Sequence, residues 1–95
     1  MTEPGPLQLD AQGQLQFPCV YPVKALTRVR ERALEQLLEE IARHARLHDP
    51  DRIQIRPSRN GRFQSVTLEL HVESRAQLES VYASLRALDI VVMTL

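Results

Sequence analysis

The sequence predicts an α+β fold: a four-stranded antiparallel sheet with two helices on one face. Three observations support this. Two alternating segments meet at Asn60-Gly61, an amphipathic helical segment lies on each side of that hairpin, and β-rich segments stand at the beginning and end of the order. The resulting order is βαββαβ. This is the split arrangement called ferredoxin-like, a sandwich that leaves the second face of the sheet open.

Size and composition indicate one small domain. The chain has 95 residues, of which 43% are hydrophobic, enough for a single core. Residues 1–15 are rich in proline, glycine and glutamine, so we expect a flexible N-terminal tail followed by one domain over residues 16–95. The 12 basic and 12 acidic residues cancel, which argues against nucleic acid as a partner.

The compartment follows from what the sequence contains. Cys19 is the single cysteine and cannot form an internal disulfide. The sequence has no apolar run of about 20 residues, the length that spans a membrane, and no basic-then-apolar signal pattern at its start. We therefore expect a cytoplasmic protein without a membrane partner.

The first strand is expected from Phe17 to Leu26. It should be interrupted or bulged, because Pro18 and Pro22 remove donors from the strand ladder. Thr27 is the expected N-cap of a helix that ends at Asp49-Pro50. The apolar side of this helix recurs every four residues, at Val29, Ala33, Leu37, Ile41 and Ala45.

The central hairpin is the best-specified element. Asn60-Gly61 suits a two-residue type I′ turn, which needs positive φ at both positions and would place Arg59 opposite Arg62. Counting outward gives two sets of pairs, because side chains alternate between faces with period two. The apolar face carries Ile55–Val66 and Ile53–Leu68, and the open face carries Arg56–Ser65, Gln54–Thr67 and Arg52–Glu69, the last of these an expected ion pair.

The remaining segments predict a helix and a strand. Ser74 and Gln77 match a capping box, in which side chains satisfy backbone donors at a helix start, and this second helix should run to about Ala87. The short β-branched segment from Asp89 to Leu95 predicts the last strand.

The open face provides a candidate binding surface. Arg56 and Ser65 lie on it, with Arg59 and Arg62 near the hairpin tip. Guanidinium groups bind carboxylate or phosphate with two hydrogen bonds and a hydroxyl can complete the shell, so a small anionic effector suits this cluster. The same residues also fit an ordinary solvated sheet face, on which arginine discourages edge pairing. Both interpretations stay open.

Other chemistries find little support. Only Phe63 among the open-face positions is aromatic, so the face lacks the stacking rings of RNA-recognition sheets. His44, His48, Asp49 and Asp51 could form a metal site on paper, but the helix break at Asp49-Pro50 separates them. The sequence has no phosphate loop, nucleophile elbow or paired-carboxylate motif. We therefore expect a non-enzymatic protein without catalytic residues, metal or cofactor.

Several of these residues carry a family resemblance. From Phe17 to Leu95 the chain resembles the YbeD-like family of small uncharacterised bacterial proteins, some of which are described as lipoate regulatory proteins. The resemblance rests on Phe17-Pro18, Lys24, His44, Pro57-Ser58, Gly61, Ser65-Val66-Thr67, Tyr82, Leu85, Met93 and Leu95. It implies a ferredoxin-like fold similar to ACT regulatory domains, which bind small effectors and often pair as homodimers. It adds Lys24 and Ser58 to the candidate ligand-binding residues.

The expected function is therefore a regulatory or ligand-binding module. Its ligand-binding residues would be Lys24, Arg56, Ser58, Arg59, Arg62 and Ser65. The alternative is a protein-interaction adaptor that offers an edge strand, the sheet face, or the apolar patch of Pro18, Val20 and Pro22 to a protein partner.

Overall fold

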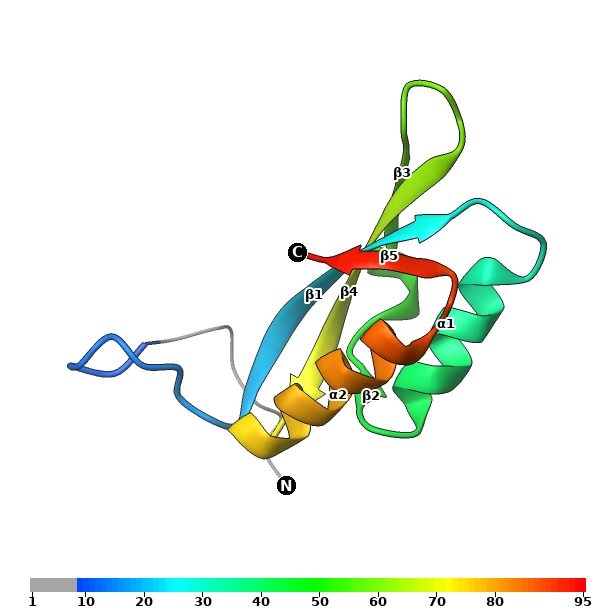
Figure 1. Cartoon of the computed structure of the whole chain (residues 1–95). Helices are drawn as coiled ribbons and strands as arrows, with labels where there is room; N and C mark the ends of the chain where they lie inside the picture. The colour runs from blue at the N-terminus through cyan, green and yellow to red at the C-terminus, as the bar shows by residue number, and fades with distance from the viewer. Residues whose placement is uncertain (1–8) are drawn as a thin grey trace.

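A computed structural model describes residues 9–95 and confirms the α+β class, with an antiparallel sheet and two helices (Figure 1). The order is βαβββαβ and the sheet has five strands instead of the predicted four, because an additional strand of two residues follows the first helix. The sheet is antiparallel, with β4 at its centre, paired with β1 on one side and with both β2 and β3 on the other. The strands are β1 (Cys19–Arg28), β2 (Arg46–Leu47), β3 (Gln54–Pro57), β4 (Phe63–Val72) and β5 (Val91–Thr94), and the helices are α1 (Ala33–Ala42) and α2 (Arg75–Ala87). Both helices cover the same face, as predicted.

The core lies between this covered face and the two helices. Alternate residues of β4 point into it, because side chains of a strand alternate between faces. The buried cluster comprises Val23, Ala33, Leu37, Ile41, Ala45, Val66, Leu68, Leu70, Val72, Leu78, Val81, Leu85 and Ile90. Full burial of one such side chain contributes on the order of 2 kcal/mol. The opposite face of the sheet, called the open face below, carries no helix.

The N-terminal segment is described only from residue 9. Residues 1–8 of the expected tail lie outside the described part. Leu9 and Leu15 form an isolated bridge, closed by a turn in which Asp10 accepts hydrogen bonds from the backbone of Gln12 and Gln14. Figure 1 shows this turn projecting away from the sheet. Leu15 and Phe17 pack against the core.

The first strand has the expected length of 10 residues but lies two residues later in the chain, and it is more regular than expected. β1 pairs with β4 without a break from Cys19 to Arg28, and Pro22 lies opposite Glu69. Because β5 pairs with β1 only from Ala25 onward, Pro22 lies where β1 has a neighbour on one side, a position that tolerates proline. The irregularity lies instead between Leu26 and Thr27, where the register with β5 shifts.

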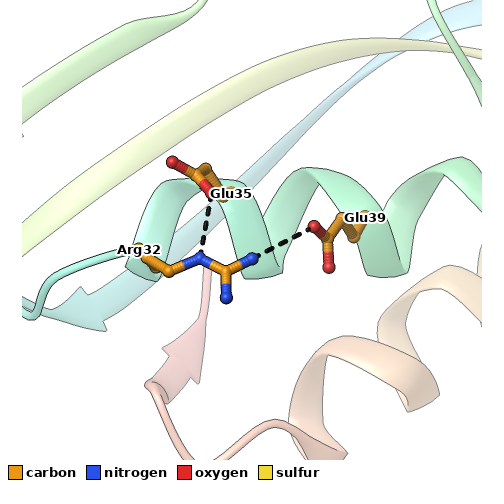
Figure 2. Close-up of polar contacts among 3 residues, drawn as sticks. All are labelled: Arg32, Glu35 and Glu39. Atoms are coloured by element: carbon orange, nitrogen blue, oxygen red, sulfur yellow. Dashed lines mark hydrogen bonds and ion pairs between the residues drawn. The ribbon is translucent and has the colours of Figure 1, made fainter.

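The first helix starts later and ends earlier than expected. Thr27 is not its N-cap but a buried residue of β1, and α1 begins at Ala33 after Arg32, which has a left-handed backbone with φ 66°. Arg32 makes no side-chain cap. Its guanidinium contacts Glu35 at 3.0 Å and Glu39 at 3.6 Å along the helix surface (Figure 2). Because these pairs are exposed, water and salt screen them and they add little to stability.

The segment after α1, expected to be helical, forms a strand and a short connection. Leu47 of β2 lies opposite Leu70, and Gln54 of β3 lies opposite Thr67. From Leu70 to Thr67, β4 covers three residue steps, whereas the chain paired with it covers seven, from Leu47 to Gln54. The connection between β2 and β3 therefore contains four extra residues. They include the 3₁₀ turn η1 (Pro50–Arg52), in which Asp49 accepts a hydrogen bond from the backbone of Asp51.

The central hairpin has the predicted register but a different turn. Gln54, Ile55 and Arg56 lie opposite Thr67, Val66 and Ser65, as expected. The two-residue type I′ turn is wrong, because Gly61 has positive φ (75°) and Asn60 does not. The loop is longer: the Ser58 amide donates to the carbonyl of Phe63, so Arg59 and Arg62 are loop residues. The side chain of Asn60 accepts a hydrogen bond from the Arg62 amide, which closes the turn.

The hairpin also buries less apolar surface than expected. Val66, Leu68, Leu70 and Val72 of β4 are core, but all four residues of β3 are exposed, and Ile55 retains 43% of its accessible surface. The tip projects beyond the rest of the sheet (Figure 1).

The last two elements follow the prediction. Ser74 Oγ accepts a hydrogen bond from the Gln77 amide at the start of α2. The side chain of Gln77 accepts from the amide of Glu73 rather than that of Ser74, and donates to the carbonyl of His44. It thereby joins the start of α2 to the segment that follows α1. β5 lies within the predicted last strand and pairs antiparallel with β1.

Candidate functional site

Four basic strand residues gather on the open face of a chain whose formal net charge is zero. Strand partners share a face, so the register places Lys24 and Arg28 of β1, Arg46 of β2 and Arg56 of β3 on the same side of the sheet, and all four are exposed. Its single acidic strand residue is Glu69, which Arg52 of η1 contacts at 3.1 Å. This confirms the predicted ion pair and leaves a positive surface.

A polar cluster lies in the middle of the open face. Ser65 and Thr67 of β4 are partly buried, with Lys24 opposite Thr67 on one side and Arg56 opposite Ser65 on the other. Gln54 completes the row beside Thr67. We call Lys24, Gln54, Arg56, Ser65 and Thr67 the central cluster.

The central cluster has the dimensions of a small-anion site. Lys24 and Arg56 are separated by β4, that is by two strand spacings and two residues along the strand, or about 12 Å between backbones. Their long side chains can therefore meet above the hydroxyls of Ser65 and Thr67. Within residues 9–95, no hydrogen bond or ion pair engages these four side chains. Their donors are available to a carboxylate or phosphate, which guanidinium and ammonium groups bind well.

The predicted site residues fall into two groups. Lys24, Arg56 and Ser65 come together in the central cluster. Arg59 and Arg62 are exposed in the hairpin loop. Ser58 has a structural contact instead: its hydroxyl donates to Asn60 Oδ1 and accepts a hydrogen bond from the Phe63 amide.

The sequence interpretation missed part of the positive face. The helix predicted between Thr27 and Asp49 includes both Arg28 and Arg46, so the prediction does not place them on the sheet. The period-two count from Lys24 through Leu26 would have reached Arg28, had the strand been extended two residues. Arg46 had no such signal, because β2 contains only two residues.

Two histidines form a second polar feature at the far end of the open face. Nδ1 of His48 lies 3.0 Å from Nε2 of His71, and the rings meet edge to face at a centroid distance of 4.8 Å. His71 is only 6% exposed although it belongs to the open face. His44 lies apart, with its Nε2 3.3 Å from a carboxylate oxygen of Glu40. His44 is thus not part of the His48–His71 pair, and the described residues include no group of three or more metal-ligating side chains.

Cys19 lies on the covered side of the sheet and is 1% exposed. Burial raises the pKa of its thiol above the ordinary value. Because the thiolate is the reactive form of cysteine, this position suits a core residue rather than a nucleophile.

Two hollows lie at the edges of the sheet rather than over the central cluster. One, of about 450 Å³, is lined by Leu38, Ile41, Ala42, Ala45, Arg46 and Leu47, and the other by Arg86 and residues of β5. Among residues 9–95, no helix has the length and apolar character needed to cross a bilayer.

Fold and surface together define a split βαβ protein with a helix-free, positively charged sheet face. Residues 12–95 match the family model described as "Protein of unknown function (DUF493)". The chain belongs to this family, which confirms the resemblance to YbeD-like proteins.

Its relatives are bacterial. The chain is 31% identical to a UPF0250 protein of Neisseria gonorrhoeae over 99 residues, covering 100% of both chains. It is 36% identical to a UPF0250 protein of Vibrio cholerae over 81 residues, covering 85% of this chain and 86% of the relative. The solution structure of protein HP0495 from H. pylori superposes with a TM-score of 0.68 at 19% identity, covering 90% of each chain. This neighbour has the same fold class.

Proposed function

We propose that this protein is a non-enzymatic regulatory module that binds a small anionic effector at the central cluster. The observation that carries the proposal is the pairing of unengaged cations and hydroxyls, with Lys24 and Arg56 flanking Ser65 and Thr67 on a helix-free face. A carboxylate or phosphate held there would receive charge-assisted hydrogen bonds from both sides. Arg59 and Arg62 add positive potential at the exposed tip, which attracts the same ligands.

Titration with inorganic phosphate and with succinate, followed by ¹H–¹⁵N NMR, tests this function. We expect saturable shifts centred on the amides of residues 24, 54, 56, 65 and 67. The double variant Lys24→Gln/Arg56→Gln should weaken binding at least tenfold. The matched control Arg43→Gln/Arg75→Gln removes the same two charges from exposed positions outside the open face and should bind as the wild type does.

Shifts that do not saturate at millimolar ligand, or that decrease equally in both double variants, would reject the central cluster. The second result would show only a response to net charge.

The edge formed by β5 favours a second candidate function, a protein-interaction adaptor. Val92, Met93 and Leu95 are 43%, 49% and 57% exposed, and residues 91–95 contain no charged side chain. Natural edge strands are usually protected by charge, proline or a bulge, so an uncharged apolar edge can accept a further strand. A second copy of the chain, pairing as a homodimer, is one such partner.

Sedimentation equilibrium of the wild type and of Met93→Lys distinguishes the two candidates. An adaptor that pairs through this edge should lose self-association in the variant. A monomeric wild type that binds phosphate at the central cluster would support the effector-binding function alone.

A further inference from the structure

The hollow between α1 and β2 has an aliphatic lining and one charged residue. Its volume of about 450 Å³ lies within the range of about 300–1,000 Å³ that small-molecule pockets occupy. Among the described residues that line it, Arg46 is the only charged one. The others are aliphatic and come from α1 and the segment that follows it: Leu38, Ile41, Ala42, Ala45 and Leu47. Such a lining suits a ligand whose apolar body carries one negative group.

The apolar part of the hollow is formed by the packed fold. Ile41 and Ala45 are core residues, 2% and 8% exposed, and Leu38 and Leu47 pack against the core while keeping part of their surface accessible. The lining is therefore held in place before any ligand enters, as is usual for small-molecule sites. Each methylene that a ligand buries against such side chains strengthens binding about fourfold.

Two donors lie at the border of the hollow. The guanidinium of Arg46 is exposed, and within residues 9–95 no hydrogen bond or ion pair engages it. The amide of His48 donates to the carbonyl of Glu69 at 2.8 Å, and alternate residues of an antiparallel strand point toward the partner. The amide of Leu47 therefore points away from β4, the one described strand with which β2 pairs. A carboxylate can accept hydrogen bonds from both groups.

The charges around the hollow favour an anion. On α1, Glu39 contacts Arg32 at 3.6 Å, and Glu40 lies 3.3 Å from the ring of His44. Arg43, exposed at the end of the helix, adds a second positive charge near Arg46.

The end of α1 does not oppose this charge with free carbonyls. The carbonyl of Ile41 accepts hydrogen bonds from the amides of His44 and Ala45, both at 2.9 Å. The carbonyl of His44 accepts one from the side chain of Gln77 at 2.8 Å. Because these carbonyls are already bonded, the partial negative charge of the helix end is reduced beside the hollow.

We propose that the hollow between α1 and β2 binds a single alkyl chain that ends in a carboxylate. The chain lies against Leu38, Ala42 and Leu47, and the carboxylate binds Arg46. The limited volume favours one chain over a bulky or two-chain lipid. This site is separate from the central cluster, and it does not depend on the binding of a small anion there.

Titration with sodium decanoate below its micelle concentration, followed by ¹H–¹⁵N NMR, tests this site. We expect saturable shifts centred on the amides of residues 38, 42, 46 and 47. Hexanoate has the same carboxylate and a shorter chain, so it should bind at least tenfold more weakly. Decyltrimethylammonium has the same alkyl chain and the opposite charge, and it should also bind at least tenfold more weakly.

Two variants test the two parts of the site. Arg46→Gln should weaken decanoate binding at least fivefold and leave decyltrimethylammonium binding no weaker. The matched control Arg43→Gln removes the same charge from an exposed position outside the lining and should bind decanoate as the wild type does. Ala42→Phe fills the hollow from the exposed last residue of α1 and should weaken decanoate at least tenfold. Ala87→Phe makes the same change at the exposed last residue of α2 and should have no effect.

The outcomes separate this site from the other surfaces of the protein. Shifts centred on residues 24, 56, 65 and 67, with equal affinity for hexanoate and decanoate, would assign the carboxylate to the central cluster and overturn this proposal. Equal affinity for decanoate and decyltrimethylammonium, or shifts centred on residues 92, 93 and 95, would overturn it as unselective apolar contact. Shifts at residues 38, 42 and 47 that grow with protein concentration alone would assign the hollow to a second copy of the chain. Selective decanoate binding at the hollow, with no response to phosphate or succinate, would support this site and reject the central cluster.

Discussion

Thr27 has a role in the fold that differs from the one its sequence context predicts, and its buried hydroxyl lowers the stability of the protein. Its side chain is 1% exposed, and its hydroxyl has no hydrogen-bond partner within the part of the chain that the structure describes. A buried hydroxyl without a partner loses its hydration and gains nothing in return. The sequence suggested an N-cap here because threonine is common at that position. The strand continued instead, since Thr27 pairs with Gln64 and Val91 on its two sides.

Thr27→Val should therefore stabilise the protein. Valine keeps the shape of the side chain and removes the unsatisfied hydroxyl, so we expect the free energy of unfolding to rise by about 1 kcal/mol. Urea denaturation measures the change. Thr67→Val, on the partly buried open face, is the matched control and should shift stability by less than about 0.5 kcal/mol. Destabilisation by Thr27→Val would mean that the hydroxyl has a partner in solution.

Tyr82 should make stability depend on alkaline pH. Burial, together with a hydrogen bond to Tyr21, raises the pKa of the Tyr82 phenol to about 12, whereas an unfolded tyrosine titrates near pH 10. The folded state thus favours the neutral phenol. Its contribution is complete below about pH 10 and is lost progressively up to about pH 12.

Tyr82→Phe has no proton to lose, so its unfolding free energy should decline less steeply than that of the wild type between pH 10 and 12. Urea denaturation at several pH values in this range compares the two slopes. Equal slopes would contradict a raised pKa for Tyr82.

At the scale of elements, the hairpin separates what the sequence could predict from what it could not. The register followed from period-two alternation, because a slip by one residue would expose Val66, Leu68 and Leu70. The turn did not follow, since Asn60 closes the loop with its side chain and not with a left-handed backbone. Asn-Gly allows both solutions, and the choice depends on Ser58, whose hydroxyl bonds both Asn60 and Phe63.

Gly61→Ala should weaken the hairpin through the backbone alone. Gly61 has φ 75°, and an added Cβ would meet nothing within 4 Å, so the expected cost of about 1 kcal/mol is conformational. Amide exchange at residues 58 and 63 should accelerate. Gly13→Ala imposes the same backbone penalty at φ 78° in the separate turn of residues 9–15 and should leave those two amides unchanged. Slower or unchanged exchange in Gly61→Ala would contradict this account of the turn.

The boundaries of α1 depended on pairing across the sheet, which local patterns do not contain. Arg28 pairs with Phe63, and Arg46 and Leu47 pair with His71 and Leu70. Because of these pairings, both ends of the predicted helix form strands, although the apolar spacing of the segment favours one longer helix. In contrast, α2 has its own cap at Ser74, and its start could be predicted from two residues. Arg28 and Arg46, two of the four basic strand residues of the open face, could not be placed on the sheet for the same reason that applies to the ends of α1.

At the scale of the whole molecule, the fold separates charges that cancel in the sequence. The open face carries Lys24, Arg28, Arg46 and Arg56 against one strand carboxylate, Glu69. On α1 and its approach, Glu31, Glu35, Glu39 and Glu40 outnumber Arg30 and Arg32. A formal net charge of zero is thus compatible with a local positive surface. A positive face can act over about 8 Å at physiological ionic strength.

A cation-exchange column measures this separation. The wild type should be retained on a sulfonate resin at pH 7 and low salt, despite its formal net charge of zero. Lys24→Gln/Arg56→Gln should elute at lower salt than Arg43→Gln/Arg75→Gln, although both lose two charges. Identical elution of the two double variants would indicate that the open face does not determine binding to the resin.

The antiparallel pairing of β1 with β5 also determines how the domain responds to tension. Ala25 lies opposite Thr94 and Thr27 opposite Val91, so the entry to β1 and the exit from β5 point toward the same end of the pair. A force applied through tethers before Cys19 and after Thr94 would load the hydrogen bonds one after another, as in unzipping, and not all together, as in shear. β5 should then peel away at low force, while pulling through residues 28 and 94 should meet greater resistance. In a chain under load, this domain would yield first at its last strand.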